Sequence, residues 1–136
     1  MFKIIFSLIL INFFSMPLFA TPSCAHKLKE LGGCARIEWK LGPKYGIFSK
    51  AQVTLTDETG SPLKNADKLE FYPWMVMEGG QEHGARETVA KKLSEGVYEV
   101  SMIHLMKMPG HWSLRIKKAG AKAKSDYLAA IPIVIK

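Results

Sequence analysis

Apolar and polar residues alternate with a period of two along most of the chain, which is the pattern of half-buried β-strands. Residues 51–57 (AQVTLTD) show it best, because Ala51, Val53 and Leu55 fall on one face and polar side chains on the other. Six further strands are predicted, two of them flanking a turn at 94–96 within residues 86–106, and the others at residues 35–41, 69–77, 111–120 and 127–136.

The fold class follows from this spacing. About seven short strands are separated by turns rich in Gly, Pro and Asp, and no long amphipathic helix interrupts them. This arrangement is typical of an all-β, immunoglobulin-like antiparallel β-sandwich, with a closed β-barrel as the alternative. Locally, residues 25–33 are expected to form a short helical turn ended by glycines, residues 79–84 a loop, and Pro73 a strand edge or a break.

Residues 1–20 have the layout of a secretory signal peptide, with an early Lys3, an apolar run and a small residue at Ala20. The apolar run over residues 4–14 is too short to span a bilayer well. Cleavage after Ala20 would leave residues 21–136 as a single domain in the periplasm or another exported location, and about 116 residues suit one core. The alternative is a lipoprotein anchored through Cys24.

Cys24 and Cys34 are the two cysteines of the chain. In an oxidising compartment an isolated pair most often forms a disulfide, and closing this short loop would stabilise the fold by roughly 2–3 kcal/mol. The nine residues between them match no common zinc spacing. A disulfide is therefore predicted, with a cysteine metal site as the alternative.

The basic charge narrows the range of partners. The net charge is +7, and removal of the signal peptide with Lys3 leaves +6. The lysines are scattered or lie in the segment 117–126, with no aromatic residues interleaved to stack on bases, so no nucleic acid partner is expected. A basic surface favours an anionic membrane or protein surface.

No set of catalytic residues can be assigned from the chain. It contains no Gly-rich phosphate loop after a strand, no nucleophile elbow and no paired histidines on a helix. We therefore expect a protein that is not an enzyme.

Methionine and histidine are concentrated in residues 98–108. Written as one continuous strand, this segment places Met102, His104, Met106 and Met108 on one face. Met102 lies closest to the ordinary core positions of the strand and is predicted to be core, since methionine commonly fills irregular core space. A histidine between two methionines is a poor choice for a dry core unless its nitrogens find partners.

A second group, Met75, Met77 and His83, lies earlier in the chain, and the two groups could meet at one end of a sandwich. Thioether and imidazole ligands together suit copper, and a Met-rich set favours Cu(I) over Cu(II). The candidate ligands are Met75, Met77, His83, His104, Met106, Met108 and His111.

Three short motifs follow one another in the second half of the chain: WMVMEGGQEHG (74–84), GVYEV (96–100) and MKMPGHWSLRI (106–116). Their order and spacing resemble the YtkA-like/FixH-type family of small exported or membrane-anchored domains. In that family a loop with Met and His precedes a Gly-x-Tyr strand and a Met-x-Gly-x-Trp turn. The resemblance covers about residues 50–118.

This resemblance implies an immunoglobulin-like sandwich that takes part in copper handling or in the assembly of copper-containing respiratory oxidases. It places Met75, Met77 and His83 in the family's loop and Met108 in its turn. A copper-receiving protein of the cell envelope is the implied partner. The competing hypothesis is an envelope module that binds a protein through the same Met-rich edge without metal, because flexible thioethers also suit adaptable surfaces.

Overall fold

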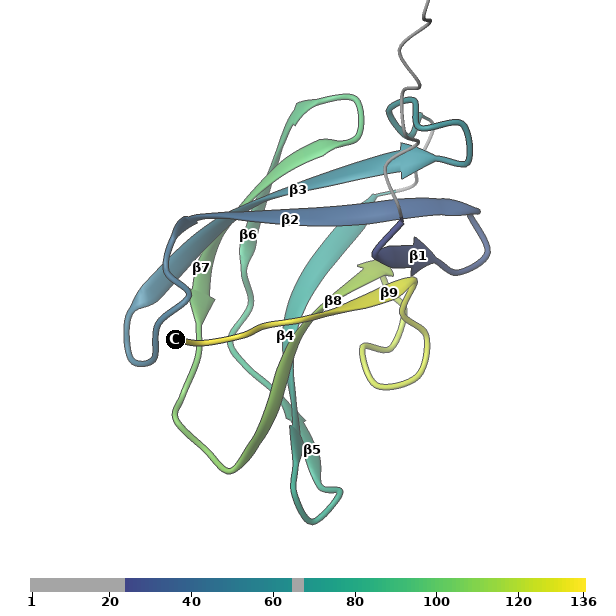
Figure 1. The fold of residues 1–136 in the computed structure, drawn as a ribbon. Helices are drawn as coiled ribbons and strands as arrows, with labels where there is room; N and C mark the ends of the chain where they lie inside the picture. The colour runs from purple at the N-terminus through teal and green to yellow at the C-terminus, as the bar shows by residue number, and fades with distance from the viewer. Residues whose placement is uncertain (1–23, 65–67) are drawn as a thin grey trace, which may run out of the picture.

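The computed structural model describes residues 24–64 and 68–136 (Figure 1). The predicted signal peptide and its cleavage after Ala20 lie outside these residues. The described chain forms nine strands and no helix: β1 (His26–Leu28), β2 (Gly33–Leu41), β3 (Phe48–Asp57), β4 (Leu69–Met77), β5 (Glu82–Gly84), β6 (Val89–Ser94), β7 (Val97–His104), β8 (Gly110–Lys118) and β9 (Ala129–Pro132).

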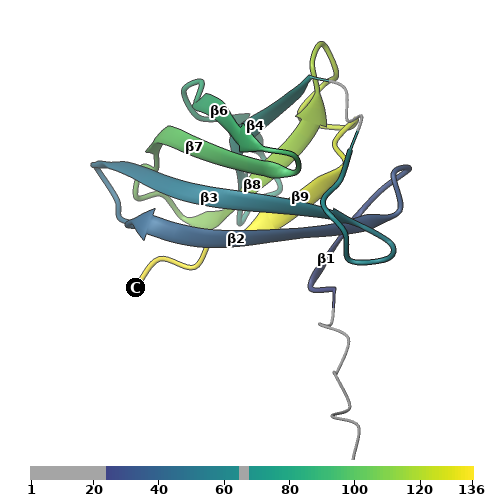
Figure 2. The same ribbon diagram turned by 90° about the horizontal axis from the view of Figure 1, so that it is seen from above.

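The strands form two antiparallel sheets, in the orders β1-β2-β3-β7-β6 and β5-β4-β8-β9. Figure 2 shows from above that the first layer lies across the second. The all-β sandwich is therefore confirmed, with two strands more than the pattern predicted. Within the described part of the chain, no helix is long and apolar enough to cross a membrane.

The core lies between the inner faces of the two sheets. Ala51, Val53 and Leu55 are fully buried on β3, as their alternation predicted. The ring centroid of Phe71 from β4 lies 5.2 Å from that of Tyr98 from β7, which joins the sheets across the core. The polar positions between these residues face outward, so burial follows the period of two.

Both added strands replace other predicted structures. The segment predicted as a helical turn instead forms β1, in which Lys27 pairs with Cys34 of β2. The predicted disulfide Cys24–Cys34 links the two strands of this hairpin. Its turn includes Glu30 and Gly32 at positive φ. The segment predicted as a loop after β4 turns back at 78–81 and forms β5. Both strands are three residues long, too short for a pattern to reveal.

A bulge in β7 overturns the prediction for Met102. Ser49 pairs with Ile103 but Ala51 with Val100, and Met102 adopts φ 61°. The irregularity inverts the alternation after Val100, so that Ile103 is buried and Met102 is 43% exposed. Met102 is therefore not core. The continuous strand expected over 98–108 also ends at His104.

The turn that follows β3 is organised by Asp57. Its carboxylate accepts hydrogen bonds from the Thr59 hydroxyl at 2.6 Å and from the backbone N–H groups of Thr59 and Ser61 at 2.9 and 3.0 Å. The Thr59 hydroxyl, helped by these N–H groups, holds the pKa of Asp57 below its usual value of 3.8. Because the folded state lowers this pKa, the stabilisation is present above about pH 3.8 and is lost as the pH falls through the lowered value.

We expect Asp57→Asn to lower the melting temperature slightly at pH 7. The deficit relative to the unchanged protein should shrink as the pH falls below 3.8, because a protonated Asp57 resembles asparagine. Thermal unfolding followed by circular dichroism at stepped pH measures this. The neighbouring exposed carboxylate serves as the control through Glu58→Gln, and an equal deficit for Asp57→Asn at pH 2 and 7 would contradict the assigned role.

Candidate metal-binding site

Three of the predicted ligands lie on the inner face at the end of β4. Met75 is fully buried and pairs with His83 of β5, so the two occupy the same face on adjacent strands. Cβ atoms of such partners lie about 4.5–5.5 Å apart. Met77 follows two residues later on the same side, half-buried against the core. The β5 hairpin thus brings together the loop histidine and both strand methionines.

Gly110 joins this group to the start of β8. It pairs with Met77, and a Cβ atom added there would lie 2.7 Å from Met75 Sδ and 2.4 Å from the carbonyl oxygen of Val76. The Met75 sulfur therefore packs directly against the β8 backbone. Met108 lies two residues before Gly110 and is half-buried against the same core. The four residues that the family resemblance assigned to the loop and the turn therefore belong to this end of the sandwich, where β5 and the connection between β7 and β8 lie (Figure 1, bottom).

Trp112, the last residue of the Met-x-Gly-x-Trp motif, has a structural role. It is buried opposite Met75, and its Nε1–H donates a hydrogen bond to the Met106 carbonyl oxygen at 3.0 Å. This bond holds the connection from β7 to β8, which carries Met108. Trp112 was not among the predicted site residues, although the motif signalled its importance.

The other three predicted ligands lie on other surfaces. His104 pairs with Phe48 on the outer face of the first sheet, with ring centroids 5.4 Å apart. Met106 is 58% exposed in the connection after β7. His111 pairs with Val76 on the outer face of the second sheet, whereas Met75 lies on the inner face. The structure does not bring these three together with the group at the end of β4.

The donor atoms at the end of β4 are soft. Among the described residues, no three His, Cys, Asp or Glu side chains are grouped in a way that could hold a metal ion. Glu82, beside His83 in sequence, points to the outer face, where it accepts hydrogen bonds from Trp74 Nε1 at 3.2 Å and Arg115 Nη2 at 3.4 Å. The set on the inner face thus combines thioethers with one imidazole, which suits Cu(I).

Arg115 supports this hairpin from the outside. The residue is 6% exposed. The Cζ atom of its guanidinium lies 5.0 Å from the ring centroid of Trp74 and 4.3 Å from that of Tyr127. Its Nη1 donates to the carbonyl oxygens of Ala123 and Lys124. One side chain therefore ties β5, through Glu82, to the loop between β8 and β9.

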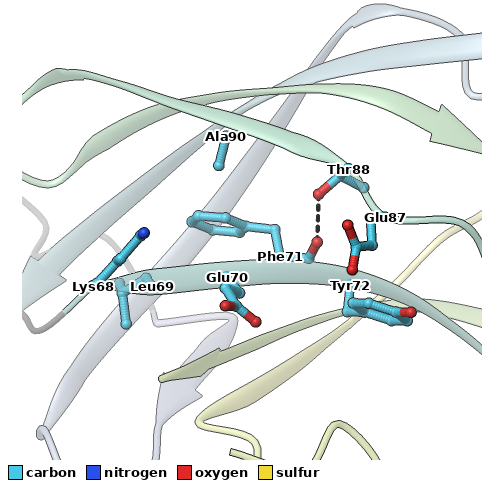
Figure 3. A pocket seen from close by; sticks show the side chains of 8 residues that line it. All are labelled: Lys68, Leu69, Glu70, Phe71, Tyr72, Glu87, Thr88 and Ala90. Carbon is cyan, nitrogen blue, oxygen red and sulfur yellow. Dashed lines mark hydrogen bonds between the residues drawn. The ribbon is translucent and has the colours of Figure 1, made fainter. Parts of the chain in front are cut away.

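A separate cavity of about 240 Å³ opens between the first half of β4 and the segment that leads into β6 (Figure 3). Phe71 points into it, and the Thr88 hydroxyl donates a hydrogen bond to the Phe71 carbonyl oxygen. The cavity exists because β5 covers β4 only from Trp74 onward. None of its lining residues is Met or His, so it is distinct from the candidate metal site.

Comparison with known proteins supports the resemblance noted in the three motifs. The model of the YtkA-like family matches residues 43–117, more than half of the 136 residues, and this range includes all seven candidate ligands. A comparison with curated proteins gave no match. The chain therefore belongs to the YtkA-like family.

Proposed function

We propose that this protein is an exported domain that binds Cu(I) through Met75, Met77, His83 and Met108 and delivers it to a protein of the cell envelope. A FixH-type role in the assembly of copper-containing respiratory oxidases fits this activity. One observation carries the proposal: β4 and β5 place two thioethers and an imidazole on one face, beside the turn that carries Met108.

The chemistry of the donors favours Cu(I) over harder ions. Both cysteines are joined in the Cys24–Cys34 disulfide, so they supply no thiolate. Methionine is then the soft ligand available, and it keeps its donor sulfur in a compartment where thiols oxidise. Thioether and imidazole are neutral ligands, so they leave the charge of the ion uncompensated, which favours release to a partner with stronger ligands.

The burial of the four residues also suits transfer. Met75 is fully enclosed, whereas Met77, His83 and Met108 are half-buried at the boundary with solvent. Exposed glycines follow Met77 in the turn 78–81. A metal ion held here would lie between the core and the surface, where an approaching partner can reach it.

We expect the double variant Met77→Leu/Met108→Leu to lose at least about tenfold in Cu(I) affinity, because leucine keeps the volume but lacks the sulfur. Competition with a chromophoric Cu(I) chelator measures the affinity, and the unchanged protein should bind one ion per chain. The matched control is Met102→Leu/Met106→Leu, which removes the two exposed thioethers of the described residues.

The histidines provide a second comparison, since His83→Gln should weaken binding and His111→Gln should not. Equal affinities for the two double variants would contradict the assignment of Met77 and Met108. An affinity of the unchanged protein weaker than micromolar would reject copper binding and favour the module that binds a protein without metal.

A further inference from the structure

Large apolar side chains are exposed together at one end of the first sheet. We call this group the end patch; its members are between 38% and 58% exposed, and they are Leu41, Tyr45, Ile47, Phe48, Met102 and Met106. Soluble domains rarely leave a large contiguous apolar surface exposed, and such a surface usually marks an interaction site.

Pairing between strands brings the patch together from three parts of the chain. Phe48 of β3 pairs with His104 of β7, and Leu41 of β2 pairs with Lys50 of β3. The loop between β2 and β3 lies against the end of β7, because Tyr45 bridges to Leu105 and the Gly46 N–H donates to the Leu105 carbonyl oxygen at 2.9 Å. This loop projects from the sandwich at the left of Figure 1.

Lysines outnumber acids around the patch, where Glu38 and Glu99 pair with two of them. Residues 39–50 and 100–118 contain no Asp or Glu, whereas they contribute Lys40, Lys44, Lys50 and Lys107 to this end of the molecule. Lys40 and Lys50 form ion pairs with acids outside these segments. Within the described residues, Lys44 and Lys107 form no ion pair. Their charges are therefore available to an anionic surface.

We propose that the end patch docks on an anionic lipid bilayer, with Tyr45, Ile47, Phe48 and Met106 entering the headgroup region and Lys44 and Lys107 binding lipid phosphates. Projecting apolar tips flanked by lysines match an interface whose interior is apolar and whose surface is negative. The lysine stems also cover apolar surface while their ammonium groups remain in the polar layer. This docking does not depend on copper binding.

Docking would also orient the candidate metal site. The connection between β7 and β8 carries Met106 of the patch and Met108 of the site, two residues apart. A domain lying on the bilayer through this end would hold the site close to the membrane surface, where proteins embedded in the membrane can reach it.

Sedimentation with lipid vesicles tests the proposal. Residues 24–136 hold both sheets and the core, so this part of the chain is used without the apolar segment before it. We expect binding to vesicles of phosphatidylglycerol and phosphatidylcholine in equal parts and little binding to phosphatidylcholine alone. Ile47→Glu/Met106→Glu should reduce binding at least about tenfold, since it removes apolar contacts and adds negative charge.

Matched controls come from the opposite end of the sandwich. Leu93, near the turn between β6 and β7, is 48% exposed, and Leu93→Glu should leave binding unchanged. Lys44→Glu/Lys107→Glu should weaken binding by about fivefold or more for each lysine, whereas reversal of the exposed Lys64 should not. High salt should weaken the binding of the unchanged protein.

Melting temperatures show whether each variant remains folded. Absence of binding to anionic vesicles, or an equal loss in the Leu93→Glu variant, overturns the proposal. Binding that resists both high salt and reversal of Lys44 and Lys107 overturns the anionic lipid as the ligand. A protein partner that depends on Ile47 and Met106 while vesicles do not bind would replace the lipid by a protein.

Discussion

Replacing Gly110 with alanine is expected to lower the free energy of unfolding by about 3 kcal/mol, from backbone strain and overpacking together. Gly110 has φ 150°, and an added Cβ would lie 2.4 Å from the Val76 carbonyl oxygen and 2.8 Å from Met77 Cα. These are backbone atoms held by the pairing of β4 with β8, so they cannot move aside without disturbing the sheet. The methyl group would also press on the Met75 sulfur at 2.7 Å.

Chemical denaturation at pH 7 measures this change. Gly79→Ala is the matched control, because no heavy atom lies within 4 Å of a Cβ added there. That variant should be close to neutral. A loss of less than about 1 kcal/mol for Gly110→Ala, below the usual range for either effect, would show that β4 and β8 are not packed so closely. If the copper proposal holds, Gly110→Ala should also weaken Cu(I) binding.

Replacing Arg115 with alanine is expected to lower the free energy of unfolding by about 3 kcal/mol or more, because several hydrogen bonds from a charged group are lost, each worth about 1.5–3 kcal/mol. The substitution would remove the stacking between Trp74 and Tyr127 and the hydrogen bonds to the loop after β8. It would also leave Glu82, whose side chain is only 21% exposed, without its arginine.

Arg115→Lys should recover only part of this loss, since an ammonium group lacks the planar fork that stacks on aromatic rings and reaches several acceptors. Arg36→Ala is the control, because Arg36 is an exposed arginine on β2. Equilibrium unfolding in urea measures all three variants. If Arg115→Ala and Arg36→Ala lowered the free energy equally, the buried arginine would not tie β5 to the loop.

The alternation of apolar residues was sufficient to predict most of the sandwich. Strands such as β3 are long enough for the period of two to be unambiguous, and their inward positions proved to be the buried ones. The disulfide could be predicted because two isolated cysteines close together, in a chain predicted to be exported, have few alternatives. The order and spacing of the three motifs in the second half of the chain indicated the family, and the family model confirmed it.

The candidate site could be predicted only in part. Met75 and Met77 share a face in any extended strand, so their relationship follows from the sequence. The position of His83 does not, because it depends on a hairpin that returns along β4 and pairs His83 with Met75. Arg115 also gave no signal, since its burial comes from two aromatic rings distant in sequence.

The sequence by itself determined the fold class, the disulfide and the family, because each depends on local periodicity, on composition or on a short motif. The tertiary structure decided which methionines face inward. A bulge at Met102 inverts the alternation of β7, and it is visible only in the pairing with β3, between segments about fifty residues apart in sequence. That inversion exposes Met102 in the end patch, and Met106 is exposed because it lies in the connection after β7, while Met75, Met77 and Met108 remain against the core.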